Sequence, residues 1–185
     1  MSRVAVLLRA VNVGGVKVSS AQLRETASAL GLGDPVTHLA TGNLVVAPGT
    51  SGARDADDVA RLVAQALTDL VGREVQTTAR THAQLAGLVG ANPFAEAARD
   101  DPSHLVVLFH PVLTTHAAGP VDLTGTTGVV HEELVTAGAH TYAWFPDGIG
   151  TSGLTAARLA RVLGTWGTGR NWNTVARLVE LTGGG

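Results

Sequence analysis

The sequence contains no cysteine, which excludes disulfide bonds, thiolate nucleophiles and thiolate metal ligands. It also lacks a long apolar run. The first such run, residues 4–8, ends at Arg9, and no run reaches the roughly 18 residues that a membrane-spanning helix needs. No signal peptide is recognised. We therefore expect a cytoplasmic protein with no membrane partner.

An excess of one charge is also lacking, because 13 basic and 15 acidic residues give a net charge of −2 over 185 residues. This balance disfavours a protein whose whole surface holds nucleic acid. From Thr151 onward, however, four arginines and one glutamate give a net charge of +3. Nucleic acid therefore stays an alternative partner for this segment. Its arginines are Arg158, Arg161, Arg170 and Arg177.

Motifs for metal, cofactor and nucleophile are missing as well. The seven histidines have no ligand spacing and no H-E-x-x-H motif is present, so we expect no metal. Residues 148–153 match G-x-G-x-x-G, but a helix rather than a second strand is predicted to follow, so no dinucleotide cofactor is expected. That segment is either a glycine-rich turn or an anion site built on Ser152 and nearby amides. Ser152 lacks a nucleophile elbow, and whether the chain is an enzyme stays open.

What is present in the first half is the order strand, helix, two strands, helix, strand. A capping box of Ser19 with Gln22 marks the start of the first helix, and Gly31 and Gly72 mark the two helix ends. The start of the second helix is favoured through the helix dipole by Asp55, Asp57 and Asp58. This order is the ferredoxin-like, split βαβ plan. A further helix follows a second capping box at residues 81–84. The predicted strands are 4–9, 36–40, 44–47 and 75–79.

The second half predicts a buried strand over residues 104–110, a hairpin of strands 129–135 and 140–145, and two helices near 154–163 and 172–181. The proline-containing stretch 92–103 is the best boundary. We therefore predict an α+β protein with a ferredoxin-like subdomain, residues 1–91, and a second α/β subdomain, residues 104–185. The two subdomains are expected to pack together as one unit.

The most unusual segment is Gly167–Val175, at the start of the last predicted helix. A helix start needs one side-chain oxygen, whereas this one carries several polar residues, a cation and an indole. One interpretation is a binding site. The alternative is that the segment only docks the helix, with Asn171 as its cap, Trp172 as its anchor, and Arg170 and Asn173 holding it to the sheet.

Four segments resemble a bacterial domain-of-unknown-function family, number 1697, whose members carry LLRGINVGG, QSGN, NPF and TxRNWNTV. Here they read LLRAVNVGG from residue 7, ATGN from residue 40, NPF from residue 92 and TGRNWNTV from residue 168. Ala10 replaces the usual glycine, and Ala40-Thr41 replace Gln-Ser, so a contact by that glutamine is lost. The resemblance implies an α+β fold with a ferredoxin-like first half and no established activity. It selects Arg9, Asn12, Gly14, Gly15, Thr41, Gly42, Asn43, Arg170, Asn171, Trp172 and Asn173.

These residues lead to the hypothesis of a small-molecule or anion-binding protein with a pocket between the two halves. Arg9 and Arg170 supply positive charge, and the Gly14-Gly15 amides supply hydrogen-bond donors. The amide side chains of the motifs fix the ligand's orientation. The expected partner is a small anion, with no cofactor. Those amide side chains belong to Asn43, Asn171 and Asn173.

Overall fold

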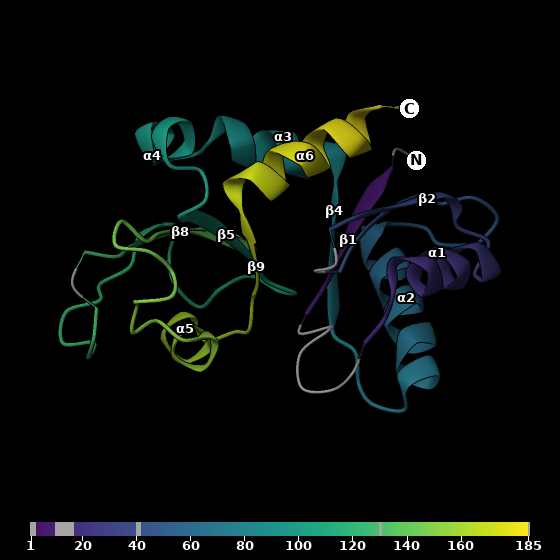
Figure 1. Ribbon diagram of the computed structural model, residues 1–185, viewed down its shortest axis with the longest axis horizontal. Coiled ribbons are helices and arrows are strands. Elements are labelled where there is room, and N and C mark those ends of the chain that lie inside the picture. The colour runs from purple at the N-terminus through teal and green to yellow at the C-terminus, as the bar shows by residue number, and fades with distance from the viewer. Residues whose placement is uncertain (1–2, 10–16, 40–41, 130, 185) are drawn as a thin grey trace. The chain divides into compact units, whose positions relative to one another are not determined.

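The computed structural model describes residues 3–9, 17–39, 42–129 and 131–184 (Figure 1). Contacts within the chain divide it into two units. The first comprises Met1–Gly87 and Arg177–Gly185, and the second comprises Leu88–Ala176. The predicted boundary between subdomains at residues 92–103 stays a prediction. We describe each unit by itself.

The first unit is an antiparallel sheet with two helices on one face (Figure 1). Its elements follow the predicted order of strands and helices, so the expected ferredoxin-like plan is confirmed. The strands are β1 (Val4–Leu8), β2 (Gly33–His38), β3 (Asn43–Ala47) and β4 (Thr77–Thr81), and the helices are α1 (Ser20–Ala29) and α2 (Ala56–Val71).

The spatial order of the strands is β2-β3-β1-β4. Capping chemistry sets the helix ends. Ser19 and Gln22 form the reciprocal capping box of α1, the Asp55 side chain accepts the Asp58 amide at the start of α2, and Gly72 ends α2 with a φ of 71°. Local sequence therefore determines where both helices begin and where α2 ends.

Alternate residues of β1 point to opposite faces of the sheet. Val4, Val6 and Leu8 pack in the core with α1 and α2, together with residues such as Val63 and Leu67. The other face carries buried side chains too, and these include polar ones. They are Ala5, Leu7, Asn43, Val45, Thr78 and Arg80.

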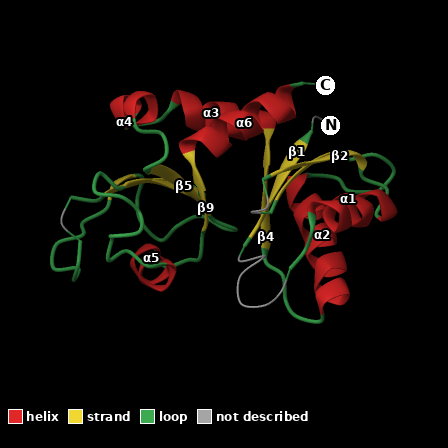
Figure 2. Ribbon diagram, in the orientation of Figure 1, coloured by secondary structure: helices red, strands yellow, loops and turns green. Residues whose placement is uncertain are grey.

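The second unit is built on a five-stranded antiparallel sheet (Figure 2). Val106, Leu108 and Ala143 pack against one helix, α5, through Leu159 and Leu163. The opposite face again combines apolar and polar side chains. The elements are α4 (Ala95–Asp100), β5 (Leu105–Phe109), β6 (Gly119–Pro120), β7 (Glu133–Ala137), β8 (His140–Trp144), α5 (Ala156–Leu163) and β9 (Thr168–Asn171).

The strand order in this sheet is β6-β7-β8-β5-β9. Two helices contribute residues to both units, namely α3 (His82–Gly90) and α6 (Trp172–Gly183). The capping box predicted at Thr81 and Gln84 is present at the start of α3. Mixed helices and antiparallel sheets confirm the α+β class.

Two segments of the second unit differ from the sequence-based expectation. The stretch 92–103, expected to be irregular, contains α4. Residues 168–171, expected to lead directly into a helix, form strand β9 before α6 begins. A four-residue strand with glycine and arginine has no apolar period, and its pairing with β5 is a tertiary effect that local propensity does not contain.

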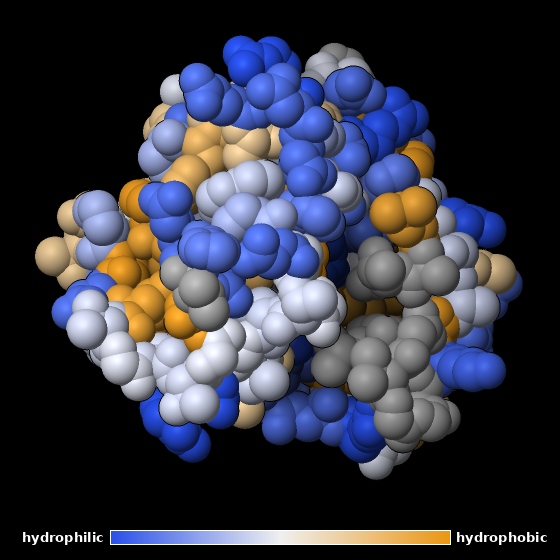
Figure 3. Space-filling model, turned by 60° about the vertical axis from the view of Figure 1, so that its left-hand side comes forward, coloured by the Kyte–Doolittle hydropathy of each residue, from blue (hydrophilic) through white to orange (hydrophobic). Residues whose placement is uncertain are grey.

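Few of the exposed residues that the structure describes are large and apolar. None of the described helices is long and apolar enough to cross a membrane. Figure 3 shows hydrophilic residues over much of the visible face, with apolar areas between them. Within the described ranges, the exposed large hydrophobic residues come from several separate segments. They are Leu39, Leu70, Val112, Leu113 and Ile149.

Candidate functional site

Arg170 lies on β9, the last strand of the second sheet, opposite Val107 of β5. Only 7% of the residue is exposed. Its Nη1 donates to the Thr168 hydroxyl oxygen at 2.8 Å and to the Gly169 carbonyl oxygen at 2.8 Å. Thr168, two residues earlier, lies on the same face of the strand. These two hydrogen bonds fix the orientation of the guanidinium plane.

The electrostatic setting of Arg170 is dominated by burial. Burial lowers the pKa of its guanidinium to about 10, so the group keeps its charge at neutral pH. Moving a charged group out of water costs free energy that hydrogen bonds recover in part. An oxyanion beside the guanidinium recovers more, because paired N–H donors match two oxygens of a carboxylate or phosphate.

Tyr142 and His140 lie on the same face of the sheet, across β5 from Arg170 and Thr168. The Tyr142 hydroxyl donates to the Leu88 carbonyl oxygen at 2.6 Å, and burial raises the pKa of this phenol to about 12. The His140 ring meets the Tyr142 ring edge-on, with centroids 5.1 Å apart. Tyr142 therefore stays neutral, and Arg170 carries a positive charge on the same face of the sheet.

The rest of the Gly-Arg-Asn-Trp-Asn segment serves two different roles. The Asn171 side-chain oxygen accepts the Thr174 amide at 3.1 Å and the Thr174 hydroxyl at 2.8 Å, so Asn171 caps α6. The Trp172 amide donates to the Pro102 carbonyl oxygen at 3.1 Å. The Trp172 side chain is half-buried, whereas Asn173 is exposed. Capping explains Asn171 but leaves Asn173 without a structural reason.

Arg9, Gly42 and Asn43 belong to the first unit, where the end of β1 meets the turn before β3. The Leu8 amide donates to the Gly42 carbonyl oxygen at 2.9 Å. Arg9 donates through Nη1 to the Gln76 side-chain oxygen at 2.5 Å. The fully buried Asn43 side chain donates to the His38 carbonyl oxygen at 2.9 Å. The structure thus brings Leu8 next to Gly42, 34 positions later in the sequence. The other predicted site residues of these segments, Asn12, Gly14, Gly15 and Thr41, lie outside the described residues.

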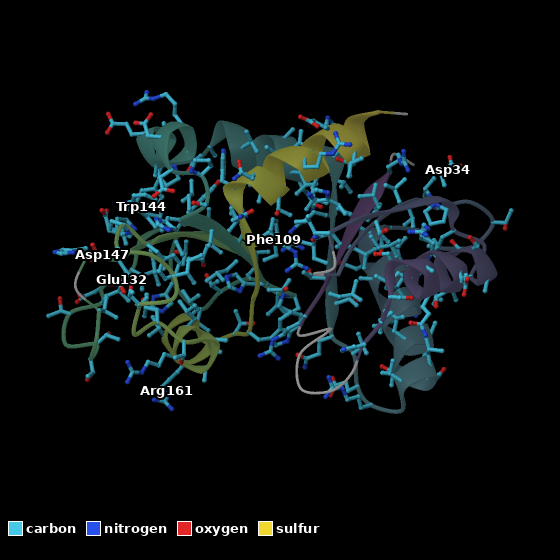
Figure 4. The ribbon with its side chains drawn as sticks, viewed as in Figure 1. Asp34, Phe109, Glu132, Trp144, Asp147 and Arg161 are labelled. Carbon is cyan, nitrogen blue, oxygen red and sulfur yellow. The ribbon has the colours of Figure 1, made fainter. Side chains whose placement is uncertain are left out.

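Ser152 lies in the second unit, in a loop before α5. Its hydroxyl donates to the Glu132 carboxylate and accepts the Leu154 amide at 3.0 Å. The amides of Thr151 and Gly153 donate to backbone carbonyl oxygens of Gly148 and Gly128. Figure 4 labels Glu132 and Asp147 at the same end of this unit. The donors assigned to an anion by the sequence are used within the chain beside a carboxylate, so we leave Ser152 out of the proposed site.

Arg80 is a candidate that the sequence analysis missed. It lies on β4 opposite Ala5, and 7% of it is exposed. Its signal in the sequence is a repeat, because Thr78-Ala79-Arg80 precedes a capped helix just as Thr168-Gly169-Arg170 does. Among the residues that the structure describes, no group of three or more His, Asp or Glu side chains is placed to hold a metal ion.

Comparison with known proteins places the chain in a family. Residues 1–131 match the family described as "Protein of unknown function (DUF1697)". The chain belongs to this family. The match ends before Arg170 and its neighbours, so the family assignment rests on the first unit and the beginning of the second.

One solved structure supports the fold of this family member over its whole length. It is "The structure of conserved bacterial protein SP0830 from Streptococcus pneumoniae", with a TM-score of 0.66 and 16% sequence identity. The similarity covers 99% of each chain. No curated protein matches significantly. At this identity the likeness establishes the fold and assigns no activity.

Proposed function

We propose that this protein binds a small oxyanion, a carboxylate or a phosphate group, at Arg170 in the second unit. Thr168 orients the guanidinium, and Trp172 and Asn173 contribute to the ligand's surroundings at the start of α6. The observation that carries the proposal is the buried guanidinium of Arg170, held in one orientation by two hydrogen bonds from Nη1.

Access to Arg170 is supported by its place in the sheet. It lies on the terminal strand of the second sheet, and the preceding residue, Gly169, is exposed. Because alternate residues face opposite sides of a strand, Gly169 points away from the Arg170 face, and a small anion approaches Arg170 along the outer edge of β9, the terminal strand.

Thermal unfolding tests the proposal. Wild-type protein is melted in increasing phosphate, sulfate, acetate and nucleotide, each compared with chloride at equal ionic strength. Binding to the folded state raises the unfolding free energy by about 2.7 kcal/mol when the free ligand is at 100 times its Kd. We expect at least one oxyanion to raise the melting temperature of the wild type and to have no such effect on Arg170→Met.

A matched control is Arg161→Met, because Arg161 is an exposed arginine on α5 in the same unit. It should keep the full ligand-induced shift. If all three proteins respond alike, the shift is a general salt effect. If no oxyanion raises the wild-type melting temperature above chloride, the proposal is wrong.

Helix docking is the main alternative, favoured by the Asn171 cap. Removing one partner from a buried charged arrangement costs about 3–5 kcal/mol when the charge is structural. Docking thus predicts that Arg170→Met is strongly destabilised and that no ligand shift exists to be lost. The binding proposal predicts that an oxyanion raises the melting temperature of the wild type and that Arg170→Met has lost this shift, whatever its stability in chloride.

Nucleic acid is the other alternative, and the C-terminal arginines give it little support. Arg170 is buried, Arg158 donates to the Gly153 carbonyl oxygen, and Arg177 pairs with Glu180 at 2.6 Å. A single-stranded oligonucleotide in the ligand panel tests it, because retention by phosphate contacts weakens steeply with salt.

A further inference from the structure

A terminal strand of each sheet runs into a helix, and these two strand-to-helix segments are similar in sequence. Residues 78–89 and 168–179 align without a gap, and five of the twelve positions are identical. The fifth position is His82 in the first unit and Trp172 in the second. The His82 ring is used within its own unit, because its Nδ1 lies 3.2 Å from the Val179 carbonyl oxygen.

The Trp172 indole, in contrast, has no hydrogen-bond partner among the residues that the structure describes. None of them accepts from its Nε1, and this nitrogen is not one of the buried atoms without a partner, so it contacts solvent. A buried tryptophan usually pairs this N–H within the fold. The Trp172 amide donates to the Pro102 carbonyl oxygen at 3.1 Å, and Asn171 caps the helix. The ring is therefore half-buried, fixed at its backbone and open at its polar edge.

Trp172 lies at the end of the strand that carries Arg170. β9 is the terminal strand of its sheet, and Trp172 directly follows its last residue, Asn171. Two residues of a strand span about 7 Å. An anion that approaches Arg170 along the outer edge of β9 therefore has the start of α6 within reach of a ring attached to it.

We propose that the ligand of Arg170 is an aromatic oxyanion, a planar ring that bears a carboxylate or phosphate group, and that Trp172 stacks on this ring. The inference rests on the proposed function and names the class of ligand within it. An indole face binds planar rings by offset or edge-on stacking, and its N–H can donate to a ring nitrogen or oxygen. Arg170 then binds the anionic group, and Trp172 selects against anions that lack a ring.

Two pairs of ligands test this inference, because the members of each pair differ by one ring. Acetate is compared with benzoate, and inorganic phosphate with phenyl phosphate, using Kd values from melting-temperature titrations at constant ionic strength. We expect the ring-bearing member to bind about tenfold more tightly, a factor typical of stacking on aromatic side chains. Trp172→Leu should bind acetate and phosphate as the wild type does and lose this preference. Trp144→Leu, which removes another half-buried indole of the second unit, should keep it.

The possible outcomes separate this inference from the proposed function. Equal Kd values within each pair, with all binding lost in Arg170→Met, overturn the aromatic class and leave the proposed function standing. A preference that persists in Trp172→Leu overturns the role of Trp172. Binding of uncharged benzamide that Trp172→Leu abolishes and Arg170→Met leaves intact supports the ring contact and overturns the proposed function. No binding of any of these compounds overturns both.

A second measurement covers the case in which Trp172→Leu does not fold. The chain has three tryptophans, so wild-type protein labelled with fluorotryptophan gives three fluorine resonances. Trp144→Phe and Trp166→Phe assign two of them and leave the third to Trp172. Phenyl phosphate should shift the Trp172 resonance more than inorganic phosphate does, because a stacked ring adds its ring current. A shift confined to Trp144 or Trp166 contradicts the inference.

Discussion

The β4–α3 segment and the β9–α6 segment solve the same structural problem with partly different residues. Both use a Thr-x-Arg strand, and both cap the following helix with a side chain. The first uses Thr81 and Gln84 in a reciprocal box. The second uses Asn171, which accepts from Thr174. The fold thus requires a cap at this position but does not require a particular residue.

The difference between the segments lies directly after the cap. The first unit has His82 and Ala83 where the second has Trp172 and Asn173. His82 Nδ1 lies 3.2 Å from the Val179 carbonyl oxygen and has a packing role in its unit. A junction of this type therefore forms without an indole or a second amide. Trp172 and Asn173 are therefore the positions at which the two segments differ most in side-chain chemistry.

Glycine-to-alanine substitutions in the turns between equivalent strands should give the largest difference in unfolding free energy between the two units. Gly42, before β3, has a φ of +82°, and a Cβ there lies 2.8 Å from the Leu8 Cβ. Gly138, before β8, has a φ of +63°, and the nearest atom to a Cβ is 3.8 Å away. We expect Gly42→Ala to cost about 2–5 kcal/mol from left-handed strain plus overpacking, and Gly138→Ala about 1–2 kcal/mol from strain alone. Urea unfolding of both variants measures these losses of unfolding free energy. Equal losses in the two variants would contradict the expected difference.

Removing the threonine hydroxyl that accepts from Arg80 or from Arg170 should lower the unfolding free energy by the same amount in the two units. Thr78→Val and Thr168→Val each remove an acceptor from a buried guanidinium while keeping the side-chain shape. A hydrogen bond to a charged group contributes about 1.5–3 kcal/mol, and we expect each variant to lose about that much. Urea unfolding with Thr126→Val, a turn threonine of the second unit, as a reference provides the measurement. A loss in one variant only would show that the two geometries are not energetically equivalent.

The helix caps should also give matching, smaller effects. Thr81→Ala removes the acceptor for the Gln84 amide, and Asn171→Ala removes the acceptor for the Thr174 amide. Each substitution should lower the unfolding free energy by about 1 kcal/mol. Asn171→Asp keeps a side-chain oxygen at the cap and should retain most of the wild-type stability. Denaturant midpoints at constant m-value test this. A loss for Asn171→Ala well above that for Thr81→Ala would give Asn171 a role beyond capping.

Acid should weaken the first unit through Asp58, at the start of α2. Its carboxylate accepts from Arg54, whose hydrogen bonds lower the Asp58 pKa from 3.8 to about 2. Because the folded pKa is below the unfolded one, this stabilisation is complete above pH 3.8 and is lost as the pH falls towards 2. The effect should be small, since the Arg54 side chain is 83% exposed and solvent screens the pair.

The corresponding helix of the second unit, α5, provides the control for this pH dependence. Its cap is Thr155, which accepts the Arg158 amide and carries no titrating group. Urea unfolding at pH 6 and pH 3 should show that Asp58→Asn loses less stability than the wild type between the two values. Thr155→Ala should lose as much stability between pH 6 and pH 3 as the wild type loses. An unchanged acid dependence in Asp58→Asn would remove Asp58 as a cause.

Asn173→Ala should have the smallest effect on stability. The side chain is exposed, and the equivalent residue of the first unit is Ala83. Surface substitutions of this kind usually change the unfolding free energy by about 0.5 kcal/mol or less. If Asn173 contributes to the proposed site, the variant keeps its melting temperature in chloride and loses part of the oxyanion-induced shift. A large loss of stability in chloride would instead assign Asn173 to helix docking.

Local patterns in the sequence predicted much of the first unit. Capping boxes and helical apolar faces identified α1, α2 and α3, and a glycine-containing connection identified the β2–β3 hairpin. Strand β9 was missed because pairing with β5, rather than an apolar period, makes it a strand. Helix α4 was missed because two prolines nearby indicated a loop.

The candidate site was predictable in its residue types but not in their arrangement. Polar residues in excess of capping needs pointed to Arg170 and Asn173, and the contact of Leu8 with Gly42 joins two of the family's segments as the strand directions allowed. Burial of Arg170 depends on the whole sheet, so no local pattern shows it. The internal repeat that contains Arg80 was present in the sequence and was overlooked. A pocket between the halves and a cytoplasmic location stay predictions.

The measurement that tests the central claim most directly is the melting temperature of the wild type and Arg170→Met in matched oxyanion and chloride solutions. Oxyanion binding at Arg170 predicts that an oxyanion raises the wild-type value with concentration and leaves the value of Arg170→Met unchanged. An equal rise in both proteins, or a loss of folding in Arg170→Met with no rise in the wild type, would contradict it.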